Sequence, residues 1–373
     1  MRFAVEKSTL HNAIQQVAKV APARSTLPIL NTILFTADAE ANQLILRTTD
    51  LEITMQTIIP VMVENEGQVA IPARFINDII SELPETTLHF EMEDDLQLSL
   101  HTEFGDYNIA GKDPEEFPAL PSMDEQETIS LKNQILLRLI EKTNFAVSKD
   151  ELKPALTGVL FQFRPSDVRA VSTDGHRLVR CIRTDASSDN YNGDVIIPTK
   201  FLGILSSNVS GDGDTNIQIG ENHVKIDFDD TVLYTRIIDE RFPDYESVIP
   251  SDNDKEMFVN IDTLIASLKR VNIFANKTTH QVTFSLAKNS LEVSAENPES
   301  NASAQEEVDV QYTSDELMLG YNAVYVMDIL RHLDTENVLF KFKSSISAGL
   351  IFPEDQEAGE NLTMLLMPIR LNE

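Results

Sequence analysis

The amino-acid sequence repeats itself three times, and this periodicity restricts the possible folds more than any other feature. The segments VAIPARFINDIISEL (69–83), VIIPTKFLGILSSNV (195–209) and LGYNAVYVMDILRHL (319–333) align, with Pro72, Pro198 and Asn322 at matching positions. These positions are separated by 126 residues (72 to 198) and 124 residues (198 to 322). A fixed period of this length predicts an array of similar domains.

Two further markers have the same period. Phe117-Pro118 and Phe242-Pro243 lie 125 residues apart, and the segments LILRTTD and VRAVSTD end 124 residues apart, at Asp50 and Asp174. LEVSAEN, which ends at Asn297, is a weaker third copy of the second marker. We therefore predict three domains, 1–122, 127–250 and 255–373, joined by the acidic linkers PSMDEQE and PSDNDK.

Each predicted domain contains a second, internal repeat. In the first domain a short strand precedes a helical stretch whose Leu10, Ile14, Val17 and Val20 form one apolar face, and three alternating strands follow. The same order then restarts with the strand QVAIP and a helix over 74–83. The pattern predicts an α+β fold in which each domain is a doubled strand-helix-three-strand unit.

Positive charge is concentrated in the predicted helices. The chain has 60 acidic and 30 basic residues, a net charge of −30. The six helical segments (8–24, 72–83, 130–149, 198–210, 262–277 and 322–333) nevertheless hold twelve basic and five acidic residues. If these helices line one surface, that surface is basic and can bind phosphates, and no base-reading motif accompanies it.

Motifs for catalysis, metals or cofactors are weak. His176 in TDGHRL (173–178) could pair with Asp174 and with Cys181 or Ser172, but residues so close on a strand and turn rarely form a relay. The GDGD loop (211–214) lacks the glycine and glutamate that a calcium loop requires. We therefore expect no catalytic residue, no metal site and no cofactor. We also expect a cytoplasmic protein, because no signal peptide or membrane span is evident.

Several motifs together with the repeat resemble the bacterial sliding-clamp family, the beta subunits of DNA polymerase III. They are TLPIL (26–30), TDLE (49–52), IPAR (71–74), TDGHRL (173–178), RFPDY (241–245), ENP (296–298) and MPIRL (367–371). The resemblance covers the full chain. It implies three domains with helices inside and sheets outside, and two chains joined head to tail in a ring around duplex DNA. It also implies binding of the replicative polymerase, the clamp loader, and repair and translesion polymerases.

The resemblance further implies a hydrophobic pocket for partner peptides, with Arg177 or Arg370 fixing the peptide's orientation. Ser247 and Ala348 depart from the best-known family member, and Asn372 and Glu373 extend beyond its end. The implied pocket residues are Leu156, Thr173, Gly175, His176, Arg177, Leu178, Pro243, Val248, Asn322, Tyr325, Ile346, Leu365, Leu366, Met367, Pro368, Ile369 and Arg370.

Two other residue sets follow from the implied ring. At the dimer interface, Tyr107 and Ile109 of the first domain would face Ile273 and Phe274 of the third, although all four could be ordinary core residues. The helices would line the hole. The candidate DNA contacts there are Arg24, Arg74, Arg138, Lys142, Lys149, Lys153, Lys200, Lys269 and Lys277.

Two other functions compete with a DNA clamp. An acidic interaction scaffold that never touches DNA explains the net charge but not the basic helices. An enzyme built on the His176 turn would require a relay at that turn, which the spacing disfavours.

Overall fold

The computed structural model describes residues 1–92, 96–123, 127–188, 190–298 and 301–371. Within them the order strand, helix, three strands occurs six times, twice in each predicted domain. The first two copies are β1 (Arg2–Glu6), α1 (Lys7–Val17), β2 (Thr32–Asp38), β3 (Gln43–Thr49), β4 (Ile53–Pro60), and β6 (Gly67–Pro72), α2 (Ala73–Glu82), β7 (Thr87–Met92), β8 (Gln97–Thr102), β9 (Gly105–Ala110), with the short β5 (Met62–Asn65) between them.

The next four copies follow the same order. They are β10 (Glu127–Lys132), α3 (Asn133–Thr143), β11 (Gly158–Phe163), β12 (Val168–Thr173), β13 (Arg177–Arg183); β14 (Gly193–Pro198), α4 (Thr199–Ser206), β15 (Asp214–Ile219), β16 (His223–Phe228), β17 (Thr231–Arg236); β18 (Lys255–Asn260), α5 (Ile261–Val271), β19 (Gln281–Ala287), β20 (Ser290–Asn297), β21 (Ala302–Asp309), with the short β22 (Gln311–Tyr312); and β23 (Leu317–Asn322), α6 (Ala323–Arg331), β24 (Asn337–Phe342), β25 (Gly349–Pro353), β26 (Glu360–Leu366).

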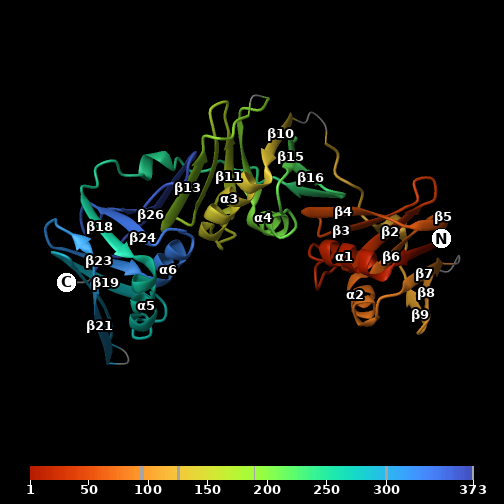
Figure 1. Cartoon of the computed structure of the whole chain (residues 1–373), viewed down its shortest axis with the longest axis horizontal. Coiled ribbons are helices and arrows are strands. Elements are labelled where there is room, and N and C mark those ends of the chain that lie inside the picture. Colours follow the sequence, from red (N-terminus) through yellow and green to blue (C-terminus); the bar gives the residue numbers. More distant parts are fainter. Residues whose placement is uncertain (93–95, 124–126, 189, 299–300, 372–373) are drawn as a thin grey trace. The chain divides into compact units, whose positions relative to one another are not determined.

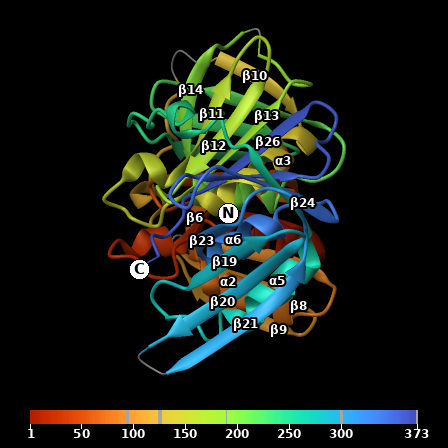
Figure 2. The same ribbon diagram turned by 90° about the vertical axis from the view of Figure 1, so that its left-hand side faces the viewer.

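The chain forms two compact units (Figure 1). The first comprises residues 1–134 and 200–237 and holds a five-stranded sheet, β5-β1-β7-β8-β9, and an eight-stranded sheet, β10-β15-β16-β17-β4-β3-β2-β6. The second comprises residues 135–199 and 238–373. It holds a nine-stranded sheet, β14-β11-β12-β13-β26-β25-β24-β18-β22, and the four-stranded sheet β21-β20-β19-β23, which faces the viewer in Figure 2.

The first strand of every repeat pairs with a strand of another repeat, and so do the last strands of four of the six repeats. The first strand always crosses to the other half of its domain, so that β1 pairs with β7 and β6 pairs with β2. The last strands join different domains: β4 pairs with β17, and β13 pairs with β26, both antiparallel. These two junctions lie inside large sheets that combine strands of two predicted domains. The compact units therefore do not coincide with the predicted domains. The bounds of those domains stay a prediction.

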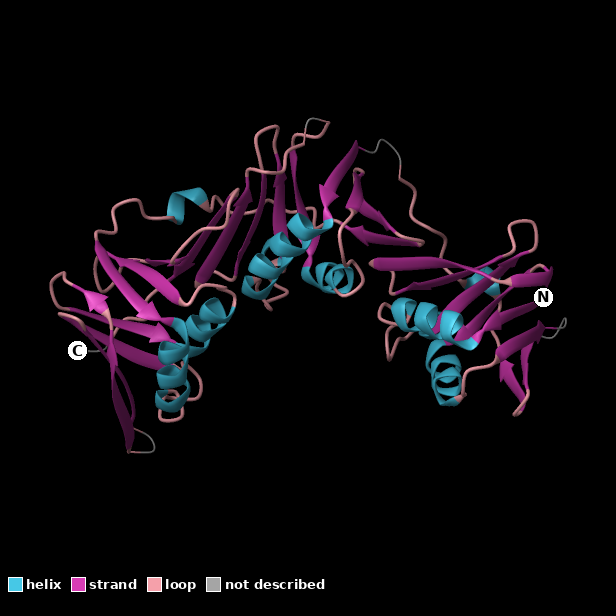
Figure 3. Ribbon diagram, in the orientation of Figure 1, coloured by secondary structure: helices cyan, strands magenta, loops and turns pink. Residues whose placement is uncertain are grey.

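The helices cover one side of the sheets within each unit (Figure 3). α1 buries Leu10, Ala13, Ile14 and Val17 against β3 and β4, as its apolar spacing predicts. In the second unit α5 packs on β18, β20 and β21, and α6 on β23 and β26. No helix in the described ranges is long and apolar enough to cross a membrane.

The junction between β13 and β26 carries a buried ion network. The Glu360 carboxylate is 1% exposed and accepts hydrogen bonds from Arg138 Nε and Nη2, at 2.8 and 2.9 Å. Arg183 Nη1 lies 3.3 Å from the same carboxylate, and Glu357, which is 52% exposed, completes the cluster from the rim. Buried charges are tolerated only when they are paired, so Glu360 holds two arginines of the second domain to the third.

Replacing Glu360→Gln should lower the free energy of unfolding of this unit by about 3 kcal/mol, because it leaves two buried guanidinium groups with one fewer anion. Glu357→Gln is the matched control, and it should cost less than about 1 kcal/mol since that carboxylate is half exposed. Urea unfolding followed by circular dichroism measures both. An equal decrease in the free energy of unfolding for both variants would show that Glu360 stabilises the unit no more than Glu357 does.

Candidate functional site

A predominantly apolar cavity of about 290 Å³ lies in the second unit, next to the junction of β13 and β26. Such concave apolar sites with a few polar groups are the usual binding places for ligands and peptides. The lining side chains come from the turn before β13, the loop over 243–248 and the end of β26. They are Leu156, Thr173, Gly175, His176, Arg177, Leu178, Pro243, Asp244, Tyr245, Val248, Leu365 and Met367.

The cavity floor is a continuous hydrophobic cluster. Leu178 and Leu365, cross-strand partners on β13 and β26, pack with Tyr245 among other buried side chains. The Tyr245 hydroxyl donates to Gln162 Oε1 at 2.6 Å, so this aromatic side chain is satisfied as well as buried. Val248 and Met367 remain 54% and 42% exposed at the rim. The floor is therefore rigid, whereas apolar surface stays accessible at the edges.

The TDGHRL turn is held by its own polar side chains. Asp174 Oδ1 accepts the backbone N–H groups of His176 and Arg177 at 2.9 and 3.0 Å, and Thr173 Oγ1 donates to the Arg177 carbonyl at 2.6 Å. Gly175 has φ +91°, a left-handed conformation that favours glycine. The turn exposes His176 and directs Leu178 into the cavity.

Arg177 is buried and has several partners inside the protein. Its side chain is 8% exposed, with Nε 3.1 Å from Asp174, Nη1 3.0 Å from Asp328 and Nη2 2.8 Å from the Phe145 carbonyl. The guanidinium carbon also lies 4.5 Å from the centre of the Tyr325 ring. These bonds use three of the five guanidinium N–H groups and fasten the cavity wall to α6, while direct orientation of a peptide by Arg177 stays a prediction.

The turn does not form a catalytic relay. Ser172 is buried and donates to the Thr143 carbonyl at 2.6 Å, and Cys181 is buried on β13. The Asp174 carboxylate is occupied by Arg177 and by two backbone N–H groups. Neither of the two nucleophiles considered for an enzyme built on His176, Ser172 and Cys181, is therefore available to it.

Ten of the seventeen predicted pocket residues line this cavity, and seven do not. Tyr325 lines a neighbouring cavity of about 410 Å³ that shares His176 and Arg177 with the first. Asn322 accepts N–H groups at the start of α6, and Leu366 is buried with 1% exposure. Because β26 alternates its faces, Leu366 lies on the other face from Leu365 and does not line this cavity.

The remaining predicted residues surround the end of β26. Ile346 is 65% exposed, and Pro368, Ile369 and Arg370 follow Met367. The Ile369 N–H donates to the Gly320 carbonyl at 2.8 Å, which fixes the chain after the rim. Ser247 is exposed, Ala348 packs at the hydrophobic cluster, and Asn372 and Glu373 lie outside the described residues.

Asp244 and Tyr245 line the cavity but were not predicted to do so. Both belong to the RFPDY motif (241–245), from which only Pro243 was carried over. The RFPDY motif therefore contained the information that was needed. Asp244 and Tyr245 could have been assigned to the cavity together with Pro243, which precedes them in the motif.

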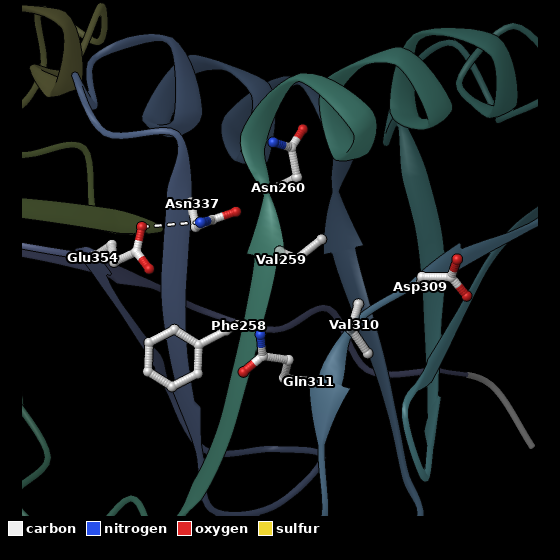
Figure 4. A pocket seen from close by; sticks show the side chains of 8 residues that line it. All are labelled: Phe258, Val259, Asn260, Asp309, Val310, Gln311, Asn337 and Glu354. Carbon is white, nitrogen blue, oxygen red and sulfur yellow. Dashed lines mark hydrogen bonds between the residues drawn. The ribbon is translucent and has the colours of Figure 1, made fainter.

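A third cavity, of about 400 Å³, lies where β22 leaves the edge of β18 (Figure 4). Three of its polar side chains bond within the protein: Asn337 donates to Glu354 at 2.9 Å, and Asn260 accepts the Thr263 N–H at the start of α5. None of the predicted site residues lines it. We assign no ligand to this cavity.

Seven of the nine predicted DNA-contacting cations are exposed: Arg24, Arg74, Lys149, Lys153, Lys200, Lys269 and Lys277. The other two predictions are wrong. Lys142 has 0% side-chain exposure, donates to the His332 carbonyl at 2.8 Å and pairs with Asp334. Arg138 is 16% exposed and belongs to the Glu360 network. Their charge stabilises the protein interior, so neither can contact a phosphate.

The four predicted interface residues divide into two kinds. Ile273 and Phe274, just after α5, are 64% and 39% exposed, so two consecutive large apolar residues lie on the surface. Tyr107 is partly exposed on the edge strand β9, but Ile109 is 5% exposed within its own sheet. The Ile109 side chain is a core residue, and only its backbone edge is available to a partner.

Comparison with known proteins identifies the fold. Models of the N-terminal, central and C-terminal domains of the DNA polymerase III beta subunit match residues 1–121, 130–244 and 246–370. The beta sliding clamp of Escherichia coli is 32% identical, and that of Pseudomonas putida is 30% identical, each over the full length of both chains. The DNA polymerase III beta subunit of Pseudomonas aeruginosa superposes with a TM-score of 0.93 at 28% identity, covering both chains completely.

The fold is thus the three-domain clamp fold. The chain belongs to the DNA polymerase III beta subunit family, the bacterial sliding clamps, and its function is that of a DNA sliding clamp. A protein of this family is a processivity factor rather than a catalyst.

The Cys181 thiol should be unreactive in the native protein. Burial raises its pKa to about 12, so almost no thiolate exists at pH 8. Ellman's reagent should therefore detect no thiol in the folded protein and one per chain in 6 M guanidinium chloride. Rapid modification of the folded protein at pH 8 would contradict the observed burial and reopen Cys181 as a reactive group.

Proposed function

We propose that two copies of this chain close head to tail into a ring around duplex DNA, and that the 290 Å³ cavity tethers DNA polymerases and their accessory proteins to that ring. One observation carries the ring: the last strands of four repeats pair with one another, and the last strands of the other two, β9 and β21, are edge strands. A second chain can satisfy both edges.

The pairing rule within the chain predicts how the copies join. β4 with β17 and β13 with β26 are both antiparallel pairs of last strands. β9 and β21 are the outermost strands of their sheets (Figure 1), and exposed edges are templates for pairing with another chain. Pairing β9 of one copy with β21 of the next repeats the internal junctions. Two such contacts bring six similar domains into one closed ring.

DNA would be held weakly by charge and firmly by topology. The exposed cations Arg24, Lys149 and Lys200 lie on or beside helical segments, and a few phosphate contacts give non-specific dissociation constants of about 10⁻⁴ to 10⁻⁶ M. Such contacts do not depend on sequence and permit sliding. An acidic scaffold that never meets DNA would have no use for a basic helical surface in a chain of net charge −30.

The cavity suits a short peptide with two apolar anchors. Leu178, Leu365 and Tyr245 supply a preformed apolar floor, while Val248 and the adaptable Met367 form walls. Backbone contacts and Arg177 or Arg370 would orient the peptide. We assign no catalytic residue to the chain, and we place it in the cytoplasm, where bacterial DNA lies.

Ring closure can be tested with Ile273→Ala combined with Phe274→Ala. The substitutions delete apolar surface worth about 25 cal/mol per Å² buried, so the molar mass by light scattering should fall toward that of one chain, 41.8 kDa, at low micromolar concentration. The variant should also be lost from nicked circular DNA, on which the unmodified ring stays until the DNA is linearised. Leu152→Ala, at a side chain that is 90% exposed in another loop, is the control. A double variant that remains dimeric would show that these residues do not form the interface.

Partner binding can be tested with Met367→Asp. A fluorescent peptide containing a glutamine, a leucine and a nearby phenylalanine should bind the native chain with a roughly micromolar dissociation constant. The unpaired carboxylate against apolar anchors should weaken binding at least about tenfold. The matched control, Met318→Asp, alters a methionine that is 55% exposed on β23 and should bind normally. Unchanged binding by Met367→Asp would place the peptide site elsewhere.

A further inference from the structure

We infer that the two strand edges that close the ring repel each other electrostatically, so that dissolved cations promote closure. This inference rests on the proposed pairing of β9 with β21 and concerns how that joint is regulated. It predicts that salt strengthens the contact between the two copies, whereas salt weakens contacts between protein and DNA.

Both mating segments are acidic and lack compensating charge. Residues 87–110, which lead through β7 and β8 to β9, contain six Asp or Glu residues and no Lys or Arg. Residues 290–309, which include β20 and β21, also contain six Asp or Glu residues and no Lys or Arg. The segments 48–73 and 344–369, which contain the internal junction strands β4 and β26, also lack Lys and Arg, but each holds four acidic residues rather than six.

The strand register places several of these carboxylates on or next to the edge strands that would pair. Glu292 on β20 stands directly opposite Glu307 on β21, and like charges in that position destabilise a sheet. Glu307 and Asp309 are exposed on the edge strand itself. On the other edge, Asp106 of β9 is 72% exposed, beside the exposed Glu103 in the preceding turn. Each edge therefore presents at least two solvent-facing carboxylates to its partner.

The nearest charged and polar groups reduce the repulsion between these carboxylates only in part. Arg270 on α5 pairs with Glu306 at 2.6 Å, on the helix side of β21, which leaves Glu307 and Asp309 without that cation. His101 Nδ1 lies 2.7 Å from Asp106 Oδ1, and Glu307 accepts a hydrogen bond from Ser290. Lys112 follows the end of β9, and Lys288 precedes β20 at the Asp309 end of its hairpin. Both lysines lie outside the paired strands.

The two junctions inside the chain are built differently. β4 and β17 meet through uncharged side chains, with the hydroxyls of Thr57 and Thr231 3.0 Å apart. β13 and β26 meet beside the complementary charges of Arg138, Arg183 and Glu360. Of the three kinds of joint, only the proposed pairing of β9 with β21 places acidic side chains of one strand near acidic side chains of the other.

This difference matches what each junction must do. A closed ring has to open before it can admit a stretch of duplex without a free end, so one kind of joint must separate while the others hold. Neighbouring strands lie about 5 Å apart, well within the roughly 10 Å range of charge interactions at 0.1 M salt. At 0.5 M salt that range shrinks to less than half, and the apolar contacts of Ile273 and Phe274 then act with less opposition.

Sedimentation equilibrium of the full chain at 0.05 and 0.5 M KCl tests the inference. The dimer dissociation constant should fall about tenfold at the higher salt concentration. Asp106→Asn with Glu307→Gln should tighten the dimer several-fold at 0.05 M and flatten the salt dependence. Glu221→Gln with Asp239→Asn changes the net charge equally at exposed sites away from both edges and should leave the dimer as in the native chain. Sucrose, which favours burial without screening charge, should not reproduce the effect of KCl in full.

Three results would overturn the inference. One is a dissociation constant that rises or stays constant between the two salt concentrations. Another is an equal gain in the control variant, which would assign the effect to net charge rather than to the edges. In both cases ring closure itself would stand, provided that the Ile273 and Phe274 variant is monomeric. If the native chain is instead monomeric at every salt concentration, the proposed head-to-tail dimer itself is wrong.

Discussion

Backbone hydrogen bonding at strand edges is the constraint on which the whole arrangement depends. Each repeat ends in a strand whose outer N–H and C=O groups require partners. The chain satisfies four of these edges by pairing the last strand of one domain with that of another, β4 with β17 and β13 with β26. Three domains in a row necessarily leave two last strands over. In the proposed ring, a second copy would pair with both of these strands.

Much of the repeat was predictable from the sequence, because apolar spacing and turn residues are local signals. The order strand, helix, three strands was predicted in the first domain and occurs in all three. The exchange of first strands and the pairing of last strands could not be predicted, since they depend on contacts between distant segments. Thr57 and Thr231, for example, meet across 174 residues. Local periodicity contains no information about such partners.

The site shows the same division between local and distant contacts. Motifs brought most of the cavity lining together correctly, but the roles of charged side chains depended on partners far along the chain. Arg177 reaches Asp328 over 151 residues, and Lys142 reaches the His332 carbonyl over 190. In the sequence both look like available cations. In the structure they serve the contact between the second and third domains, and the net basic charge left on the helices is smaller than the residue count indicates.

The cavity itself is a product of one of these junctions. Leu178 and Leu365 face each other only because β13 and β26 share a sheet, and the Met367 N–H donates to the His176 carbonyl just beyond the last pair. The same junction is secured by Glu360 between two arginines. A junction with complementary, buried charge therefore holds the cavity walls together, whereas in the proposed ring the joint between copies would carry exposed, like charge. Such a ring would open at that joint without loosening the cavity.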